Sequence, residues 1–452
     1  MKFCQTFRPI SISLSPNTEK DDIDLALKSI LKPWHWKNGS TSSPQDGSTG
    51  SPQEENAIEK LEKEFKNYLG AKHAISFNSG RSAFLAILKS LNLNESNDVL
   101  LQAFTCNAAV NPILWAGLKP VYVDCDEKTF NIDTEDLKRK ITHSTSSGQA
   151  PKVVVVQHTF GLPSEMDEIL GICQKNNLIL IEDCAHSLGA NYQTGRSAPC
   201  NSLGIKKSQK VGTFGKAAFF SFSRDKVISS VYGGIVVTND DALAKKLREF
   251  QGKVDYPSNF WIFQQILHPI LMNYLILPAY SLLRIGKTLL SVFQWLKILS
   301  KAVHWKEKRG RKPNYFPKRM PNALAILALN QFKKLKKLNQ HRQEIANFYQ
   351  NELRNTDFEL PINQKQIFLR FTIKHPKAHQ VIKKSWQKNI LIGDWYTTPI
   401  APHDTKLDKI QYQFGSCPKA EKLSKETFNL PTHINISPKE AQKIITFLKQ
   451  SL

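Results

Sequence analysis

The sequence predicts an α/β protein with a large three-layer α/β/α domain, whose sheet is mostly parallel, and a smaller C-terminal α+β domain. Two observations predict this fold. The first half of the chain alternates short β-rich runs with helical patterns, and one run, 153–156, is four valines, as in a strand buried on both faces of a parallel sheet. From Ile367 onward, short strands and helices return in a smaller unit.

The predicted strands of the large domain follow one another with helices between them. The strands are expected at 73–77, 98–102, 120–123, 153–156, 178–181, 217–222 and 234–237, and the helices at 82–91, 107–116 and 166–175. A repeated strand–helix–strand order gives a doubly wound sheet, in which ligands bind at the carboxyl ends of the strands.

Three stretches rich in polar or small residues, 37–55, 143–150 and 197–209, are predicted to be loops. A longer interruption divides the 452-residue chain into three parts. Residues 1–254 form an N-terminal segment and the large domain, 255–314 form an insertion, and 315–452 form a long helix, beginning after Asn322, and the small domain.

The insertion is unusual in its distribution of charge. Residues 256–283 contain no Asp, Glu, Lys or Arg, and three prolines interrupt this run, so that no clean membrane-spanning helix of about 20 residues fits. Residues 281–342 contain sixteen Lys and Arg and one acidic residue, Glu307, and so contribute +15 of the net charge of +23.

Three interpretations of the insertion remain open. It is a membrane-interface hairpin that contacts anionic lipid through residues 256–313, an apolar patch buried in a dimer or in the core, or a lid over the active site. Nucleic acid is not expected as a partner, because no aromatic–basic recognition motif accompanies the charge.

The cysteines and the N-terminus bear on the cellular compartment. Seven cysteines are scattered singly, the number is odd, and none forms a C-x-x-C pair. This pattern indicates a reducing compartment and predicts neither a disulfide framework nor a metal site. Residues 1–15 lack the apolar segment of a signal peptide. The expected location is cytoplasmic, with a peripheral position on the inner face of the cytoplasmic membrane if the insertion binds lipid.

One candidate site follows the first predicted strand of the large domain. Ser79, Gly80 and Arg81 open a helix there, and Gly80 allows close approach of the backbone to a ligand. The free N–H groups of a first helical turn can hold a phosphate. The alternative is an ordinary N-capped turn.

Two further candidates lie at strand ends. Asp183 ends a buried strand, where a carboxylate is costly unless it meets a positive group such as a pyridinium nitrogen. Lys226 follows an apolar strand, where desolvation lowers the pKa of a lysine and makes it a Schiff-base nucleophile. The alternatives are an N-cap carboxylate and a surface lysine. A phosphate turn, a strand-end Asp and a strand-end Lys in this order are the layout expected for pyridoxal phosphate.

At these motifs the sequence resembles the DegT/DnrJ/StrS family of pyridoxal-phosphate sugar aminotransferases, which have the fold-type I architecture. The matching segments include FNSGRSAFLAIL, LIEDCAHSLGA, VGTFGKAAFFSFSRDKV and, near the C-terminus, GSCPKAEKLSKETFNLPTH. The resemblance extends over most of the chain outside the inserted stretches.

The resemblance implies a role for each matching residue. Lys226 would bind the cofactor aldehyde covalently and later transfer the proton, and Asp183 would pair with the ring nitrogen. Gly80 and Arg81 would bind the phosphate through backbone N–H groups, with Ser221 adding a hydroxyl. Phe104 would stack on the ring, and His186 would lie near the ring oxygen. No firm role follows for His158.

The implied reaction passes an amino group from glutamate to a keto sugar carried on a nucleotide diphosphate, for glycan or amino-sugar synthesis, in a homodimer. Two alternatives remain. One is a sugar dehydratase with the same cofactor, although the family's dehydratases replace the lysine that is kept here as Lys226. The other is a non-catalytic scaffold docked on the membrane.

The sequence departs from the family pattern at two places. Val227 follows Lys226, where the family usually has Asn. Pro317 stands where the family has an Asn that reaches the phosphate across a dimer, and proline cannot make that contact. Lys318 or Arg319 could replace it.

Overall fold

The computed structural model describes residues 8–37, 56–94, 97–146, 150–195, 208–362 and 366–451. The loops predicted at 37–55, 143–150 and 197–209 lie partly or almost wholly outside these residues. Cys4 and Cys200 lie outside them as well. The five described cysteines are free thiols.

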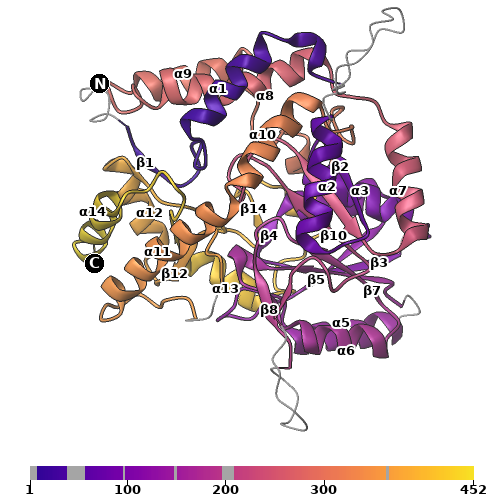
Figure 1. Ribbon diagram of the computed structural model, residues 1–452. Coiled ribbons are helices and arrows are strands. Elements are labelled where there is room, and N and C mark those ends of the chain that lie inside the picture. The colour runs from indigo at the N-terminus through magenta and orange to yellow at the C-terminus, as the bar shows by residue number, and fades with distance from the viewer. Residues whose placement is uncertain are drawn as a thin grey trace, which may run out of the picture.

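A seven-stranded sheet forms the centre of the large domain (Figure 1). Its order is β2 (His73–Phe77), β11 (Gly234–Thr238), β10 (Ala217–Ser221), β7 (Ile179–Asp183), β6 (Val153–Gln157), β3 (Asp98–Gln102) and β5 (Lys119–Val123). The strand β11 runs antiparallel to both of its neighbours, and the remaining pairs are parallel. The predicted α/β class with a mostly parallel sheet is confirmed.

Helices cover both faces of the sheet because the strands bury side chains on both sides. One face packs against α3 (Gly80–Ser90), α4 (Asn107–Trp115) and α7 (Asp241–Lys253). The other packs against α2 (Ala57–Leu69), α5 (Thr134–Ser146) and α6 (Met166–Lys175). In β10, Phe219 faces the first set and Phe220 the second. Strand periodicity thus fills two cores at once.

The predicted long helix after Asn322 is divided into α10 (Asn322–Lys333) and α11 (Leu335–Leu353). The junction residue, Lys334, has φ −92° and ψ 0°, and its ammonium lies 2.9 Å from Asp21 and 3.0 Å from Asp22. These acids belong to α1 (Lys20–Ile30), so the junction ties the N-terminal helix to the C-terminal part.

The C-terminal part contains a two-stranded antiparallel sheet of β12 (Phe371–Lys374) and β15 (Thr427–Leu430). Three helices, α12 (Ala378–Gln387), α13 (Pro418–Glu426) and α14 (Pro438–Lys449), accompany it. Two short parallel pairs connect distant segments: β1 (Ile10–Ser11) with β13 (Ile390–Leu391), and β4 (Thr105–Cys106) with β14 (Ile400–Ala401). The second pair brings the small unit to the edge of the predicted ligand site.

The insertion consists of α8 (Asn259–Leu271), a π-helical turn η4 (Met272–Ile276), α9 (Ile285–Trp295) and a 3₁₀ turn η5 (Glu307–Arg309). The helices α1, α8 and α9 lie together along one side of the molecule (Figure 1). In α8, Trp261 and Ile262 are buried in the core with α2 and α10, so this part of the apolar run is internal. Leu283, two residues before α9, and Trp295, its last residue, are 86% and 79% exposed. Among the described residues, no helix is long and apolar enough to cross a membrane.

A buried ion pair joins the insertion to the large domain. Arg81, in the first turn of α3, contacts Glu307, whose side chain is fully buried. Glu307 also accepts a hydrogen bond from the backbone of His304 at 2.8 Å, and its carbonyl accepts one from Asn111 at 3.0 Å. Burial by itself would lower the pKa of Arg81, but the Glu307 carboxylate outweighs it and raises that pKa.

We predict that Glu307→Ala lowers the free energy of unfolding by about 3–5 kcal/mol, because Arg81 is left buried without its counterion. Guanidinium denaturation measures the change. The matched control is Asp255→Ala, which removes the acidic partner of Lys318 from an exposed pair and should cost at most about 1 kcal/mol. Equal effects of the two substitutions would contradict the anchoring role of Glu307.

Candidate active site

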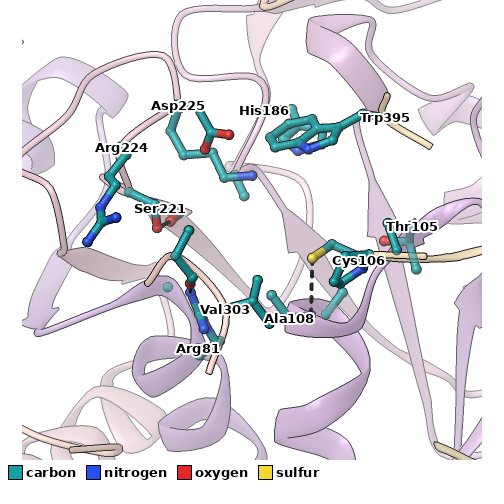
Figure 2. Close-up of a pocket in the computed structure, with 18 of the residues that line it drawn as sticks. Arg81, Thr105, Cys106, Ala108, His186, Ser221, Arg224, Asp225, Val303 and Trp395 are labelled. Carbon is teal, nitrogen blue, oxygen red and sulfur yellow. Dashed lines mark hydrogen bonds between the residues drawn. The ribbon is translucent and has the colours of Figure 1, made fainter. Parts of the chain in front are cut away.

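A pocket lies at the carboxyl ends of β7 and β10, where the fold predicts a ligand. Figure 2 shows side chains from the large domain, the insertion and the C-terminal part around one cavity. Six of the eight predicted site residues line it: Gly80, Arg81, Asp183, His186, Ser221 and Lys226. Residues far apart in the sequence, from 80 to 226, therefore meet in one place.

Ser79 and Phe104 are not among the residues that line this pocket. The Ser79 hydroxyl caps α3 by accepting a hydrogen bond from the backbone of Ser82 at 3.0 Å. The Phe104 ring is buried against Phe130, Phe160 and Tyr396 instead, with centroid distances of 5.8, 6.3 and 5.4 Å.

Cys106 faces the pocket two residues after Phe104 (Figure 2). Phe104 has φ 60°, and this left-handed turn between β3 and β4 directs its ring away. The Cys106 sulfur accepts a hydrogen bond from the backbone of Ala108 at 3.5 Å and so caps α4. Burial raises the pKa of the Cys106 thiol, which keeps it neutral.

The first turn of α3 forms one end of the pocket. Within the described part of the chain, the backbone N–H groups of Gly80 and Arg81 make no hydrogen bond. A Cβ added to Gly80 would lie 2.8 Å from the Ser221 Cβ, so only glycine allows this close packing. The helix N-terminus and the nearby hydroxyls of Ser221 and Ser223, 3.0 Å apart, suit a phosphate group.

Residues of the insertion close this same end. Ala302 and Val303 line the pocket. The carbonyl of Ala302 accepts a hydrogen bond from Arg81 at 3.2 Å, and the guanidinium of Arg224 donates to Ser300. The insertion is therefore part of the pocket wall.

The two residues that sequence reasoning offered in place of the family's Asn have partners within the chain. Arg319 donates to the carbonyls of Gln251 and Val254 at 2.9 and 2.8 Å, where it caps the end of α7. The Lys318 ammonium lies 3.3 Å from Asp255. Neither lines the pocket.

Lys226 lies in the turn after β10 with its amine in the pocket. Its Nζ lies 4.8 Å from the centre of the Trp395 ring and makes no ion pair within the described residues. Burial lowers the pKa of Lys226. Asp225, Cys106 and Asp183 partly oppose this shift, and Arg370 adds to it. A larger fraction of the amine is therefore unprotonated and nucleophilic than in an exposed lysine.

Asp183 is the last residue of β7 and is buried. One of its oxygens accepts a hydrogen bond from the backbone of Ala185 at 2.9 Å. Burial raises the pKa of Asp183, and the nearby Lys226 and His158 lower it by a smaller amount. A cationic ring nitrogen in the pocket would stabilise the ionised carboxylate.

His158 lies behind this strand end. It accepts a hydrogen bond at Nδ1 from the backbone of Ser164 at 3.1 Å, so Nε2 carries the proton toward Glu182, 3.2 Å away. Together with Cys184 these residues could hold a metal ion by proximity. However, the Glu182 carboxylate already accepts three backbone N–H groups, of Gly212, Phe214 and Gly215, at 2.6–2.8 Å.

An aromatic stack forms the opposite wall. The His186 ring lies parallel to Trp395, with centroids 5.4 Å apart, and the two are side by side in Figure 2. Burial, Lys226 and Arg370 lower the pKa of His186 well below its ordinary value, so the ring is neutral. The guanidinium of Arg370 lies 3.3 Å from the centre of Trp395 on the same stack and 3.2 Å from Asp225.

Sequence reasoning missed Trp395, Asp225 and Arg224 as pocket residues. Arg224 and Asp225 directly precede Lys226. Two charged residues at the end of an otherwise apolar strand could have indicated that they belong to the pocket. Trp395 lies about 170 residues downstream and is brought in by the β4–β14 pairing, which carries no local sequence signal.

The pocket fits pyridoxal 5′-phosphate by the chemistry of its groups. Unused N–H donors and hydroxyls can bind the phosphate, Asp183 can bind a protonated ring nitrogen, and Lys226 offers an amine whose pKa is lowered by burial. The N–H donors follow β2, Asp183 ends β7, and Ser221 and Lys226 lie at and just after the end of β10, so all of these groups line one pocket.

Comparison with known proteins supports this interpretation. The DegT/DnrJ/EryC1/StrS aminotransferase family matches residues 48–261 and 298–449. A GDP-perosamine synthase of Caulobacter vibrioides is 34% identical over 205 residues, which are 45% of this chain and 50% of that protein. A UDP-N-acetyl-3-dehydro-alpha-D-glucosamine 3-aminotransferase of Acidithiobacillus ferrooxidans is 25% identical over 396 residues, 87% of this chain and 88% of that protein.

Solved structures share the fold. The aminotransferase PseC of Helicobacter pylori, involved in pseudoaminic acid biosynthesis, superposes with a TM-score of 0.69 at 19% identity, covering 98% of this chain and 99% of that one. A GDP-4-keto-6-deoxymannose-3-dehydratase with bound GDP-perosamine also has a TM-score of 0.69, at 18% identity, and covers 98% and 100%. Since the family match extends over most of the chain on both sides of the insertion, the protein belongs to the DegT/DnrJ/EryC1/StrS family and is a pyridoxal-phosphate-dependent aminotransferase.

Proposed function

We propose that the protein transfers the amino group of glutamate to a keto sugar carried on a nucleoside diphosphate, in glycan or amino-sugar synthesis, as a homodimer. The observation that carries the proposal is the meeting of Lys226 and Asp183 in one pocket at neighbouring strand ends. Bound pyridoxal phosphate supplies an aldehyde that accepts the amino group and a ring that delocalises electrons of the reacting carbon.

The residues of this chain then have separate tasks. Burial lowers the pKa of Lys226, and its amine in the unprotonated form can take a proton from the α-carbon of the amino donor. Asp183 keeps the ring nitrogen charged. The stack of His186 and Trp395 covers one side of the pocket, and Ala302 and Val303 exclude water at the phosphate end.

Sugar dehydration remains the second candidate, because a dehydratase shares the fold. Dehydration removes a hydroxyl from the sugar and leaves no nitrogen on it, whereas transamination leaves the hydroxyls in place. The retained Lys226 favours transamination, since it can return a proton to the aminated carbon.

We also propose a peripheral position on an anionic membrane. Leu283 and Trp295 are the most exposed apolar side chains of the insertion, and Lys297 and Lys301 follow them in sequence on its surface. Exposed Trp and Leu beside Lys are typical of segments that enter the interface of anionic bilayers.

We predict that Lys226→Ala lowers the rate of glutamate-dependent amination by at least about 100-fold, because the proton at the α-carbon loses its acceptor. The assay follows transfer of ¹⁵N from labelled glutamate to keto-sugar nucleotides by mass spectrometry. Lys216→Ala, which removes a lysine paired with Asp240 outside the pocket, is the control. A wild-type product that has lost a hydroxyl group and carries no label would establish the dehydratase instead.

The protonation of Lys226 gives a second prediction. The rate at which apoprotein reacts with added pyridoxal phosphate should rise with pH as the amine loses its proton, at a lower pH than for an ordinary lysine. Asp225→Asn removes a carboxylate that raises the pKa of Lys226, so the rising limb should move to still lower pH. Asp241→Asn, at the exposed start of α7, should leave it unchanged. A shift of the limb to higher pH in Asp225→Asn would contradict this electrostatic account.

Membrane association is tested with point substitutions, because deleting the insertion would also remove Glu307 and the buried face of α8. The double variant Leu283→Ser/Trp295→Ser should float about tenfold less with phosphatidylcholine–phosphatidylglycerol vesicles than wild type. Phe414→Ser, at a side chain 64% exposed elsewhere in the C-terminal part, is the matched control. Wild-type protein that stays unbound would end the proposal.

A further inference from the structure

A second, wider cavity opens from the cofactor pocket. Its volume is about 1090 Å³, compared with about 180 Å³ for the pocket at Lys226, and the two share Asp394, Thr397 and His403 as lining residues. A molecule whose reacting carbon lies at Lys226 can therefore extend past these three residues into the second cavity.

Four segments line this cavity. They are the N-terminal residues 11–14, the insertion from Tyr280 to Lys287, the face of α12 from His379 to Gln387, and the segment from Asn389 to His403. Residues 262–297 fall outside the family match, so that match does not include the wall that the insertion supplies.

The cavity is strongly cationic. Arg284 and Lys287 project from the start of α9, and Lys383 from α12. None of the three forms an ion pair with another residue of the described part of the chain, in contrast to many lysines elsewhere on the surface. Asp394 is the single carboxylate among the described lining residues. Unpaired cations around a concave site favour an anionic ligand.

Aromatic rings are available beside the cations. Trp386 is 45% exposed, and its indole N–H donates to the carbonyl of Ile392 at 2.9 Å, which fixes the ring in the cavity wall. Tyr280 lies on the wall supplied by the insertion. A fixed, half-exposed indole provides a stacking surface for a nucleobase. Such stacking accepts any base, because every base has a π-face.

We propose that this cavity binds the nucleoside diphosphate portion of the sugar substrate, with Arg284 and Lys287 on the diphosphate and Trp386 against the base. The inference rests on the proposed function, and it assigns substrate recognition to the insertion. The sugar then occupies the passage at Asp394, Thr397 and His403, between the cations and Lys226.

The test measures binding of UDP, GDP and dTDP to the holoenzyme by calorimetry, with inorganic pyrophosphate as a probe that lacks the base. Arg284→Asn/Lys287→Gln should weaken the tightest of the three nucleotides and pyrophosphate at least tenfold. Asparagine is chosen because Arg284 has φ 61°, a left-handed conformation that asparagine tolerates. Trp386→Ala should weaken the nucleotide but leave pyrophosphate unchanged.

The matched control is Lys297→Gln/Lys301→Gln, which removes two positive charges of the insertion that do not line the cavity. Its nucleotide affinity should equal that of wild type. The inference is overturned if no nucleotide binds wild type, if the control weakens binding as much as the cavity variant, or if the cavity variant binds normally.

The glutamate half of the reaction, followed by the visible absorbance of the cofactor, separates this inference from the proposed function. Glutamate should react normally with the cofactor in Arg284→Asn/Lys287→Gln. If wild type fails to react with glutamate yet binds nucleotide through Arg284 and Lys287, the proposed function fails and the cavity assignment stands. If it reacts and the variant binds nucleotide like wild type, the cavity assignment alone fails.

Discussion

The buried pair of Arg81 and Glu307 is the contact on which the arrangement of the site depends. Arg81 stands in the first turn of α3, the turn that offers its N–H groups to a phosphate, and Glu307 is fully buried in the insertion. An unpaired charge at either position would be costly, so the two segments must stay together. The same contact brings Ala302 and Val303 over the pocket and places the start of α9 beside the second cavity.

The pocket itself works by desolvation. Asp183 and Lys226 lie at neighbouring strand ends, where burial raises the pKa of the acid and lowers that of the amine. Both pKa shifts disfavour the charged form of the side chain. In pyridoxal phosphate, a protonated ring nitrogen would stabilise the Asp183 carboxylate, and the aldehyde would react with the neutral amine of Lys226. The pocket is therefore complementary to pyridoxal phosphate in charge and reactivity.

Most of the fold was accessible to sequence reasoning because strand and helix periods differ. The seven strands of the sheet were predicted within two residues, and six site residues meet in one pocket. Phe104 was expected to stack on the cofactor ring, but it does not line the pocket. The alternation of a strand does not continue through the left-handed turn after β3, so Cys106 lines the pocket in its place. Trp395 could not be predicted, because the pairing of β4 with β14 that brings it to the pocket is only two residues long. It joins segments about 300 residues apart, and so short a pair produces no hydrophobic pattern in the sequence.

The contacts of residues 281–342 explain much of the net charge of +23. Several cations between 281 and 342 bind partners within the protein: Arg342 is fully buried against Asn17 and the carbonyl of Val227, Lys334 holds α1, and Lys308 reaches Asp404. These charges stabilise the packing of the chain, so they contribute little to attraction of an external partner.

The cations left over are concentrated on the insertion, where Arg284 and Lys287 face a cavity and Lys297 and Lys301 face outward. The basic residues that the composition shows therefore belong to three groups. One group is paired inside the protein, one lines the ligand cavity, and one lies on the outer surface. Only the last two can act on ligands or lipid.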